Sequence, residues 1–286
     1  MRAHGAVTQV PAASTSDHIC WVYDEDDASF DSAVRRFLAG GLERHERVLV
    51  IGERVIASVG TAGDGFGDVA ALVAAGALRT LTTAEAYAAA GEFVPGSQRT
   101  FYDTATRQAL ADGYSGLRVV AEVSPLAGAA GTRATLVEWE HVADRYVAEG
   151  SGFTALCAYS GRLPAQALAD VASVHPLVHA ATPPPFQVFF DDDRLALTGS
   201  VDTFSADRLA RVLASSPVGN DGAVLDLGQV EFVDVAATRV IARWAQDLQA
   251  RALPLEVRGA SPLLQRMWRV LGLTQMAPVA FTRPAA

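Results

Sequence analysis

The stretch Arg-Val-Leu-Val-Ile at residues 47–51 decides the fold of the first part of this chain. Its four consecutive apolar residues predict a strand that is buried on both faces, as expected inside a parallel sheet. Just before it, residues 30–42 place apolar side chains at helical spacing, and Asp27 or Ser29 can cap the start of that helix. A helix followed by a buried strand is typical of an α/β fold.

The same alternation continues along the chain to residue 180. Further strands are predicted at 18–23, 78–81, 117–123 and 153–159, and further helices at 98–113, 132–149 and 163–174. Because consecutive parallel strands need crossover connections, this order predicts a parallel sheet with helices on both faces.

A proline-rich segment, Ala-Thr-Pro-Pro-Pro at 181–185, divides the chain, because consecutive prolines favour a stiff, extended linker. We therefore expect a disordered leader at 1–16, a first domain at 17–180 and a second domain at 186–286. The second domain has its own pattern, with elements in the order ββαβαβα. They are expected at 186–190, 194–200, 205–215, 222–227, 235–251, 255–258 and 261–271.

Composition excludes several classes of protein. The chain has 286 residues, a net charge of -9 and two cysteines, Cys20 and Cys157. An acidic balance argues against a nucleic-acid surface, and two cysteines do not make a disulfide framework. No apolar run is long enough to span a membrane, and residues 1–16 lack the apolar segment of a signal peptide. We expect a cytoplasmic protein with no nucleic-acid or membrane partner.

Three segments of the second domain carry a resemblance to a known family. They are Leu-Asp-Leu at 225–227, Val-Glu-Phe-Val-Asp at 230–234 and Leu-Glu-Val-Arg-Gly-Ala-Ser at 255–261. With the element order, they resemble STAS domains of the anti-sigma-factor-antagonist type. The resemblance implies signal transduction and transcription regulation through docking to an anti-sigma factor or an anti-sigma-like kinase.

In that family a serine at a helix N-terminus receives a phosphate, which the free N–H groups of the helix accommodate. The family pattern is Asp-Ser-Ser/Thr-Gly-Leu, and the aligned residues here are Asp234, Val235, Ala236, Ala237 and Thr238. Both hydroxyl positions are apolar. We expect the phosphorylation switch to be absent, or moved to Thr238. Asp234 is expected to cap the helix, whose start remains as a docking surface.

The first domain carries a second resemblance. Its motifs are His-x-Cys-x-x-Tyr at 18–23, Phe-Leu-x-x-Gly-Leu at 37–42, Glu-Arg-Val-Leu-Val-Ile at 46–51, Phe-Tyr at 101–102, Leu-Cys-Ala-Tyr at 156–159 and His-Pro at 175–176. They cover most of the segment and resemble the MEDS domain, a sensory module of bacterial and archaeal regulators. The resemblance implies a small, hydrocarbon-like effector, which open α/β sheets bind at the carboxyl ends of their strands.

The pattern also resembles RecA/KaiC-like ATPases, so we expect a RecA/KaiC-like parallel sheet followed by a smaller STAS α/β domain. The phosphate loop is altered: Asp-Glu-Asp-Asp-Ala-Ser-Phe at 24–30 has four carboxylates and neither glycine nor lysine. Carboxylates repel a triphosphate, so we expect no enzymatic activity and no cofactor. A divalent cation on this loop, a residual nucleotide hydrolase and a constitutive scaffold remain as alternatives.

The candidate ligand-binding residues of the first domain lie on or after the predicted strands and on two helices: His18, Cys20, Tyr23, Glu53, Tyr102, Glu122 and Glu140. Glu122 interrupts an apolar strand and must be paired or protonated if buried. Glu53 falls near the acidic residue that polarises water in RecA-like ATPases. A metal needs three or four ligands, and the available set of His18, Cys20, Cys157 and His175 is scattered, so no metal is predicted. The sequence identifies neither the ligand nor the partner, and it leaves a homodimer open.

Overall fold

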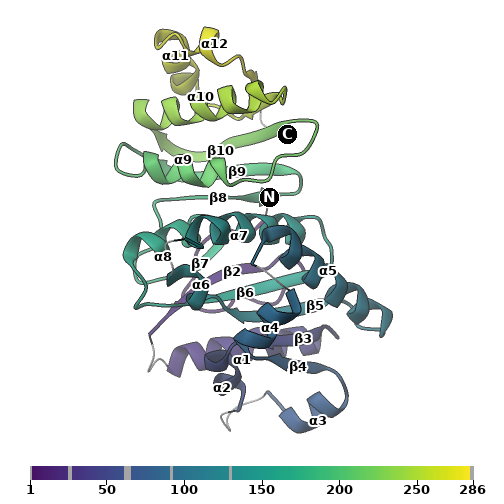
Figure 1. Ribbon diagram of the computed structural model, residues 1–286. Helices are drawn as coiled ribbons and strands as arrows, with labels where there is room; N and C mark the ends of the chain where they lie inside the picture. The colour runs from purple at the N-terminus through teal and green to yellow at the C-terminus, as the bar shows by residue number, and fades with distance from the viewer. Residues whose placement is uncertain (1, 25–27, 61–65, 91–92, 129–130, 284–286) are drawn as a thin grey trace.

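The computed structural model describes residues 2–24, 28–60, 66–90, 93–128 and 131–283, and it shows two α/β units stacked along one axis (Figure 1). The first unit contains a seven-stranded sheet and the second a smaller, five-stranded sheet. The acidic residues at 25–27 lie outside the described residues, so the expected acidic loop stays a prediction.

The first sheet is parallel throughout, as the buried strand at 47–51 predicts. Its strand order is β1-β7-β2-β6-β5-β3-β4. The strands are β1 (Gly5–Ala6), β2 (His18–Tyr23), β3 (Arg47–Ile51), β4 (Leu78–Leu81), β5 (Leu117–Glu122), β6 (Phe153–Ser160) and β7 (Leu177–His179).

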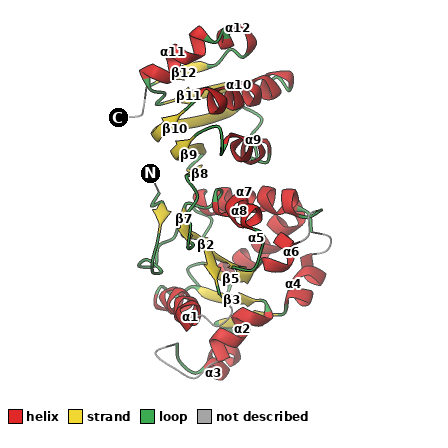
Figure 2. Cartoon of the chain, turned by 90° about the vertical axis from the view of Figure 1, so that its left-hand side faces the viewer, coloured by secondary structure: helices red, strands yellow, loops and turns green. Residues whose placement is uncertain are grey.

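Helices cover both faces of this sheet (Figure 2). One face packs against α1 (Ala28–Glu43) and α2 (Glu53–Gly60), and alternate side chains of β2, such as Ile19 and Trp21, point to it. Cys20 belongs to the opposite face, where the core includes side chains of the helices that follow β4. These are α4 (Thr83–Ala90), α5 (Pro95–Ala111), α6 (Ser124–Gly128), α7 (Arg133–Ala148) and α8 (Ala165–Ala172), while the short α3 (Val69–Ala74) lies beside β4. The period-2 alternation of strand side chains thus assigns each residue of β2 to one layer.

The second sheet has the order β12-β11-β10-β9-β8, with β8 and β9 antiparallel and the other pairs parallel. Its strands are β8 (Phe186–Asp191), β9 (Arg194–Val201), β10 (Ala223–Val233), β11 (Leu255–Arg258) and β12 (Ala280–Thr282). Its helices are α9 (Ala206–Ala214), α10 (Val235–Ala250), α11 (Pro262–Val270) and α12 (Leu273–Met276). The predicted strand at 222–227 is too short, because β10 follows β9 through two register shifts as far as Val233.

The expectation of a disordered leader at 1–16 is wrong for the residues described. Gly5 and Ala6 form β1, which pairs with β7 at the edge of the first sheet. The guanidinium of Arg2 donates to the Asp144 carboxylate at 2.8 Å and to the Phe190 carbonyl at 2.7 Å. Sequence patterns did not reveal this, because the partners lie more than 140 positions away.

The two units share α7, which lies between the first sheet and the edge strand β8 (Figure 1). The hydrophobic core runs continuously from one unit to the other: Val188 and Phe190 of β8 join the same core as Ala143 and Val147 of α7. The prolines at 183–185 are largely exposed, and the chain packs against α7 directly after them. Among the described helices, none is long and apolar enough to cross a membrane.

Candidate functional site

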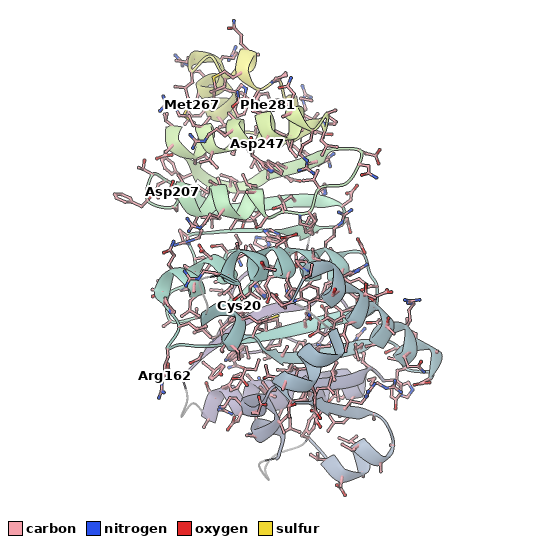
Figure 3. All side chains as sticks on the ribbon, in the orientation of Figure 1. Cys20, Arg162, Asp207, Asp247, Met267 and Phe281 are labelled. Atoms are coloured by element: carbon pink, nitrogen blue, oxygen red, sulfur yellow. The ribbon has the colours of Figure 1, made fainter. Side chains whose placement is uncertain are left out.

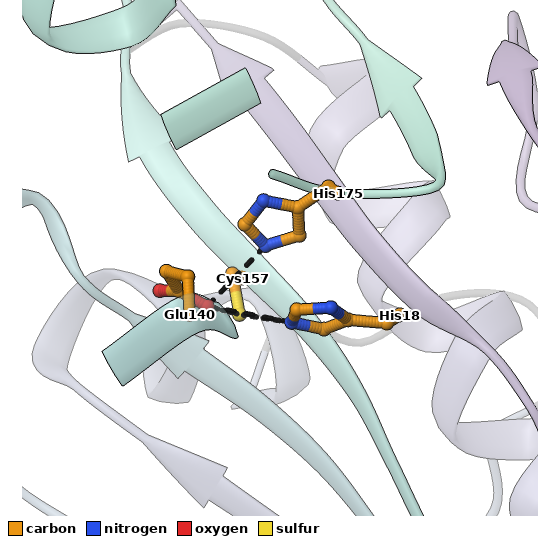
Figure 4. A group of neighbouring side chains, drawn as sticks. All are labelled: His18, Glu140, Cys157 and His175. Carbon is orange, nitrogen blue, oxygen red and sulfur yellow. Dashed lines mark hydrogen bonds and ion pairs between the residues drawn. The ribbon is translucent and has the colours of Figure 1, made fainter. Parts of the chain in front are cut away.

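Four side chains from four different elements meet in the interior of the first unit (Figure 4). His18 comes from β2, Glu140 from α7, Cys157 from β6 and His175 from the turn after α8. All four are buried, and their donor atoms lie within 4.8 Å of one another. The two imidazoles are tilted at 31° with ring centres 4.1 Å apart.

The Oε2 atom of Glu140 lies at the centre of these contacts. It is 3.3 Å from Nε2 of His18, 3.4 Å from Nε2 of His175 and 3.3 Å from Sγ of Cys157. The other carboxylate oxygen, Oε1, accepts a hydrogen bond of 2.6 Å from the Tyr159 hydroxyl. Glu140 therefore directs one oxygen into the cluster while Tyr159 holds the other.

A second buried carboxylate supports the cluster from outside. Asp144, one turn along α7, lies 3.1 Å from Nδ1 of His18 and accepts the 2.8 Å hydrogen bond from Arg2. Its Oδ2 accepts a 2.5 Å hydrogen bond from the backbone N–H of Phe190 in β8. Because Glu140 and Asp144 are four residues apart on a helix, both project from the same face.

The electrostatics follow from burial among opposite charges. Burial opposes ionisation of both carboxyl groups, but interactions with His175 and His18 hold the pKa of Glu140 well below its usual range. Arg2 and His18 likewise lower the pKa of Asp144 to about 2 against the effect of burial. The pKa of His18 is raised, because the two carboxylates outweigh the desolvation that lowers it. Burial lowers the pKa of His175, and His18 adds to that effect.

With two nitrogens, a carboxylate oxygen and a sulfur facing one another, these residues can hold a metal ion or form a buried hydrogen-bond network. The sequence names the residues but does not show that they converge. His18 and Glu140 are among the predicted candidates. Cys157 and His175 appear only in the scattered set, and Asp144 is missed because its role depends on partners in three other elements.

Comparison with protein-family models matches most of this unit. The MEDS model, described as MEthanogen/methylotroph, DcmR Sensory domain, matches residues 17–176, more than half of the chain. The chain belongs to the MEDS family. A second model, described as Mlab, STAS domain, matches residues 187–278. The two resemblances expected from the sequence are therefore confirmed. Comparison with the curated proteins gives no match.

A MEDS domain joined to a STAS domain indicates a signalling or regulatory protein that acts through protein–protein interaction. The expected fold class is also confirmed: a parallel α/β unit precedes a smaller α/β unit. The remaining predicted residues of the MEDS domain fall into two groups.

The first group lies at the carboxyl ends of the strands. The Glu122 carboxylate accepts a 3.3 Å hydrogen bond from the Tyr23 hydroxyl and a 3.1 Å bond from the Arg54 backbone N–H at the start of α2. This is the pairing that a carboxylate at the end of an apolar strand requires. Glu53 is exposed and accepts a 2.8 Å hydrogen bond from Thr83. Tyr23 and Glu122 thus meet, whereas Glu53 faces α4.

The second group lies on the α5 and α7 face of the sheet. Tyr102 stacks on Trp139 and, with Glu122 and Cys157, lines a small apolar cavity of about 30 Å³. That volume is about the share of one water molecule in the liquid. Cys20 pairs in register with Cys157 on the neighbouring strand and lies inside the MEDS domain (Figure 3). Burial raises the pKa of the Cys20 thiol well above its usual value.

In the STAS domain, the candidate docking site is the start of α10. The Asp234 carboxylate accepts a 2.9 Å hydrogen bond from the Ala237 N–H, which makes it the N-cap, and a 2.8 Å bond from the Thr203 hydroxyl. Val235 is 40% exposed. Thr238 is fully buried, and its hydroxyl donates to the Asp234 carbonyl at 2.7 Å. In this conformation the Thr238 hydroxyl is buried and already bonded, which argues against a switch moved to that residue.

Proposed function

We propose that this chain is a non-enzymatic signalling regulator. Its MEDS domain senses a small molecule or a partner, and its STAS domain docks, without being phosphorylated, to an anti-sigma factor or an anti-sigma-like kinase. The observation that carries the proposal is the start of α10, where Val235 and Ala236 replace hydroxyl residues and Thr238 is buried.

Two exposed apolar side chains near the start of this helix support a docking role. Phe204, directly after Thr203, is 95% exposed, and Phe232, two residues before Asp234, is 51% exposed. Thr203, next to Phe204, hydrogen-bonds to Asp234, so the two loops are held together. Large exposed apolar side chains gathered at one place are typical of a protein–protein interaction site.

A direct connection between the two domains supports the transmission of a signal. Three backbone or side-chain groups of β8 bond to the MEDS domain: Gln187 donates to the His175 carbonyl at 2.7 Å, Val188 to the Ser173 carbonyl at 2.7 Å, and Phe190 to Asp144. His175 belongs to the buried cluster, and Asp144 bonds to His18 of the same cluster. A change in the cluster therefore reaches the edge strand of the STAS domain through one or two contacts.

Binding of the full chain to each purified anti-sigma factor or anti-sigma-like kinase of its own organism, measured by titration calorimetry, tests the proposal. We expect one such protein to bind, and Val235→Asp to weaken that binding by at least about tenfold. An aspartate in the first turn is compatible with the helix dipole, so the fold is retained. The matched control is Val73→Asp, which places the same charge on an exposed valine of α3.

Incubation of the bound pair with labelled ATP completes the test. We expect no phosphate on the first turn of α10, because Val235, Ala236 and Ala237 carry no hydroxyl and Thr238 is buried. Failure of every candidate to bind, or equal weakening by both variants, would contradict the docking role. Labelling at the start of α10 would contradict the loss of the switch.

A further inference from the structure

We propose that His18, Glu140, Cys157 and His175 form a tetrahedral binding site for a divalent transition-metal ion of the zinc type. The inference goes beyond the proposed function, since a metal is not required for docking by the STAS domain. It rests on the spacing of the four donor atoms, on the residues that orient them and on the charge balance of the site.

Four of the six separations between the donor atoms are close to those of ligands on one small cation, and all six lie within 4.8 Å. A tetrahedral ion with ligands at about 2.1 Å separates those ligands by about 3.4 Å, and a sulfur ligand lengthens its separations slightly. Here the distances from Oε2 of Glu140 are 3.3 Å to His18, 3.4 Å to His175 and 3.3 Å to Cys157. The distance from Sγ of Cys157 to Nε2 of His18 is 3.7 Å.

The groups outside the cluster leave the correct atoms free for a metal. The Val171 carbonyl, which can only accept, lies 2.8 Å from Nδ1 of His175, so that nitrogen carries the hydrogen. Nε2 of His175 is buried and makes no hydrogen bond with any residue that the structure describes. The Asp144 carboxylate accepts from Nδ1 of His18 in the same way.

These outer contacts are the ones that metal-bound histidines make. A ligating histidine almost always donates its second ring N–H to a carboxylate or a backbone carbonyl, which fixes the ring and its tautomer. His18 uses a carboxylate and His175 a carbonyl, and the Tyr159 hydroxyl fixes the non-ligating oxygen of Glu140. Three of the four ligands therefore have an orienting partner.

The charges also balance. The two positive charges of the ion match the Glu140 carboxylate and the Cys157 thiolate, because a metal-bound thiol loses its proton. Arg2 matches Asp144, with the two atoms 2.8 Å apart and almost no solvent exposure. The mixed nitrogen, oxygen and thiolate set favours zinc-type ions over magnesium or calcium, which prefer oxygen ligands only.

Because the donors are buried, the ion enters during folding, as in other structural metal sites. The full-length protein is therefore refolded with Co²⁺, whose absorption spectrum reports tetrahedral geometry and sulfur ligation, and Zn²⁺ is counted by elemental analysis after expression. We expect about one ion per chain and a thiolate-to-cobalt absorption band.

Two cysteine variants then assign the site. Cys157→Ser should lose the thiolate band and bind the ion at least about tenfold more weakly. Cys20→Ser changes the buried neighbour in register, and it should keep the band and the affinity of the wild type. Circular dichroism and elution volume verify that each variant is folded. If a variant does not fold, X-ray absorption of the zinc-loaded wild type, in which a sulfur ligand gives a Zn–S distance of about 2.3 Å, replaces it.

Absence of stoichiometric metal in the folded wild type would overturn the proposal. In that case the four side chains form a metal-free polar network with Asp144. Equal loss of the band in both cysteine variants, or a band retained by Cys157→Ser, would overturn the assignment of the ligands.

Discussion

In the MEDS domain, Asp144 is fully buried and bonds to three partners from distant segments, whereas in the STAS domain Asp234 lies near the surface and caps its own helix. Both are aspartates beside a candidate site. The first cannot be removed without leaving buried groups unpaired, and the second can be lost at small cost. Changes at the buried site should therefore alter the free energy of unfolding and the coupling between the domains. Changes at the exposed site should cost little stability.

The largest effect expected from this comparison is that of Asp144→Ala. The variant leaves Arg2 and the Phe190 N–H without their acceptor in the interior, and breaking a buried charged pair costs about 3–5 kcal/mol. Urea denaturation measures the free energy of unfolding. Asp247→Ala, at an exposed position of α10, is the control and should change it by less than about 0.5 kcal/mol. A loss below about 1 kcal/mol for Asp144→Ala would remove the distinction between the two sites.

A smaller loss is expected for Arg2→Ala, which tests the ordered N-terminal segment. The variant removes hydrogen bonds to Asp144, to the Phe190 carbonyl and to the Ser16 carbonyl. Because Asp144 keeps its contacts with His18 and the Phe190 N–H, we expect a total loss of about 2 kcal/mol, the scale of one hydrogen bond to a charged group. The same denaturation experiment applies. Arg36→Ala removes only an exposed contact with Gln9, so its unfolding free energy should match that of the wild type. Equal unfolding free energies of the two variants would mean that the contacts of Arg2 do not hold the N-terminal segment in place in solution.

The smallest effect belongs to the exposed site. Asp234→Ala removes the N-cap of α10 and should cost about 1 kcal/mol at neutral pH. Although partial burial opposes it, the N–H of Ala237 and the hydroxyl of Thr203 lower the pKa of Asp234. The contribution is therefore complete above the pKa that Asp has in the unfolded chain, and it is lost as the pH falls through the lower pKa of the folded state.

Repetition of the denaturation at acidic pH checks that sign. The difference between wild type and Asp234→Ala should shrink as the carboxyl group becomes protonated. The control is Asp207→Ala, which removes an exposed aspartate from the first turn of α9, and its unfolding free energy is measured at the same pH values. A difference that grows on acidification would show that Asp234 does not act as an ionised cap.

Both domains could be read from the sequence where the information is local. The apolar run at 47–51 predicts a parallel strand buried on both faces, and Asp234 is predicted to cap the helix that follows it; the structure has both. The changed phosphorylation motif was also visible, because its residues are consecutive. The burial of Thr238 was not, since it depends on how α10 packs.

The buried cluster could be predicted only in part. His18 and Glu140 were among the candidates, but four elements must converge before they make a site with Cys157 and His175. Register between parallel strands places Cys20 beside Cys157, and sequence spacing carries no information on such register. The order of the N-terminal segment is not predicted either, because the composition of residues 1–16 does not reveal that Arg2 has a buried partner.

The central claim is that the buried cluster is coupled to the edge strand of the STAS domain. Hydrogen–deuterium exchange of residues 186–191, measured in Glu140→Gln and in Glu138→Gln, tests it most directly. Both changes neutralise a glutamate of α7, but Glu138 is exposed and Glu140 is buried in the cluster. We predict faster exchange of β8 in Glu140→Gln and wild-type exchange in Glu138→Gln. Unchanged exchange of β8 in Glu140→Gln would contradict the coupling.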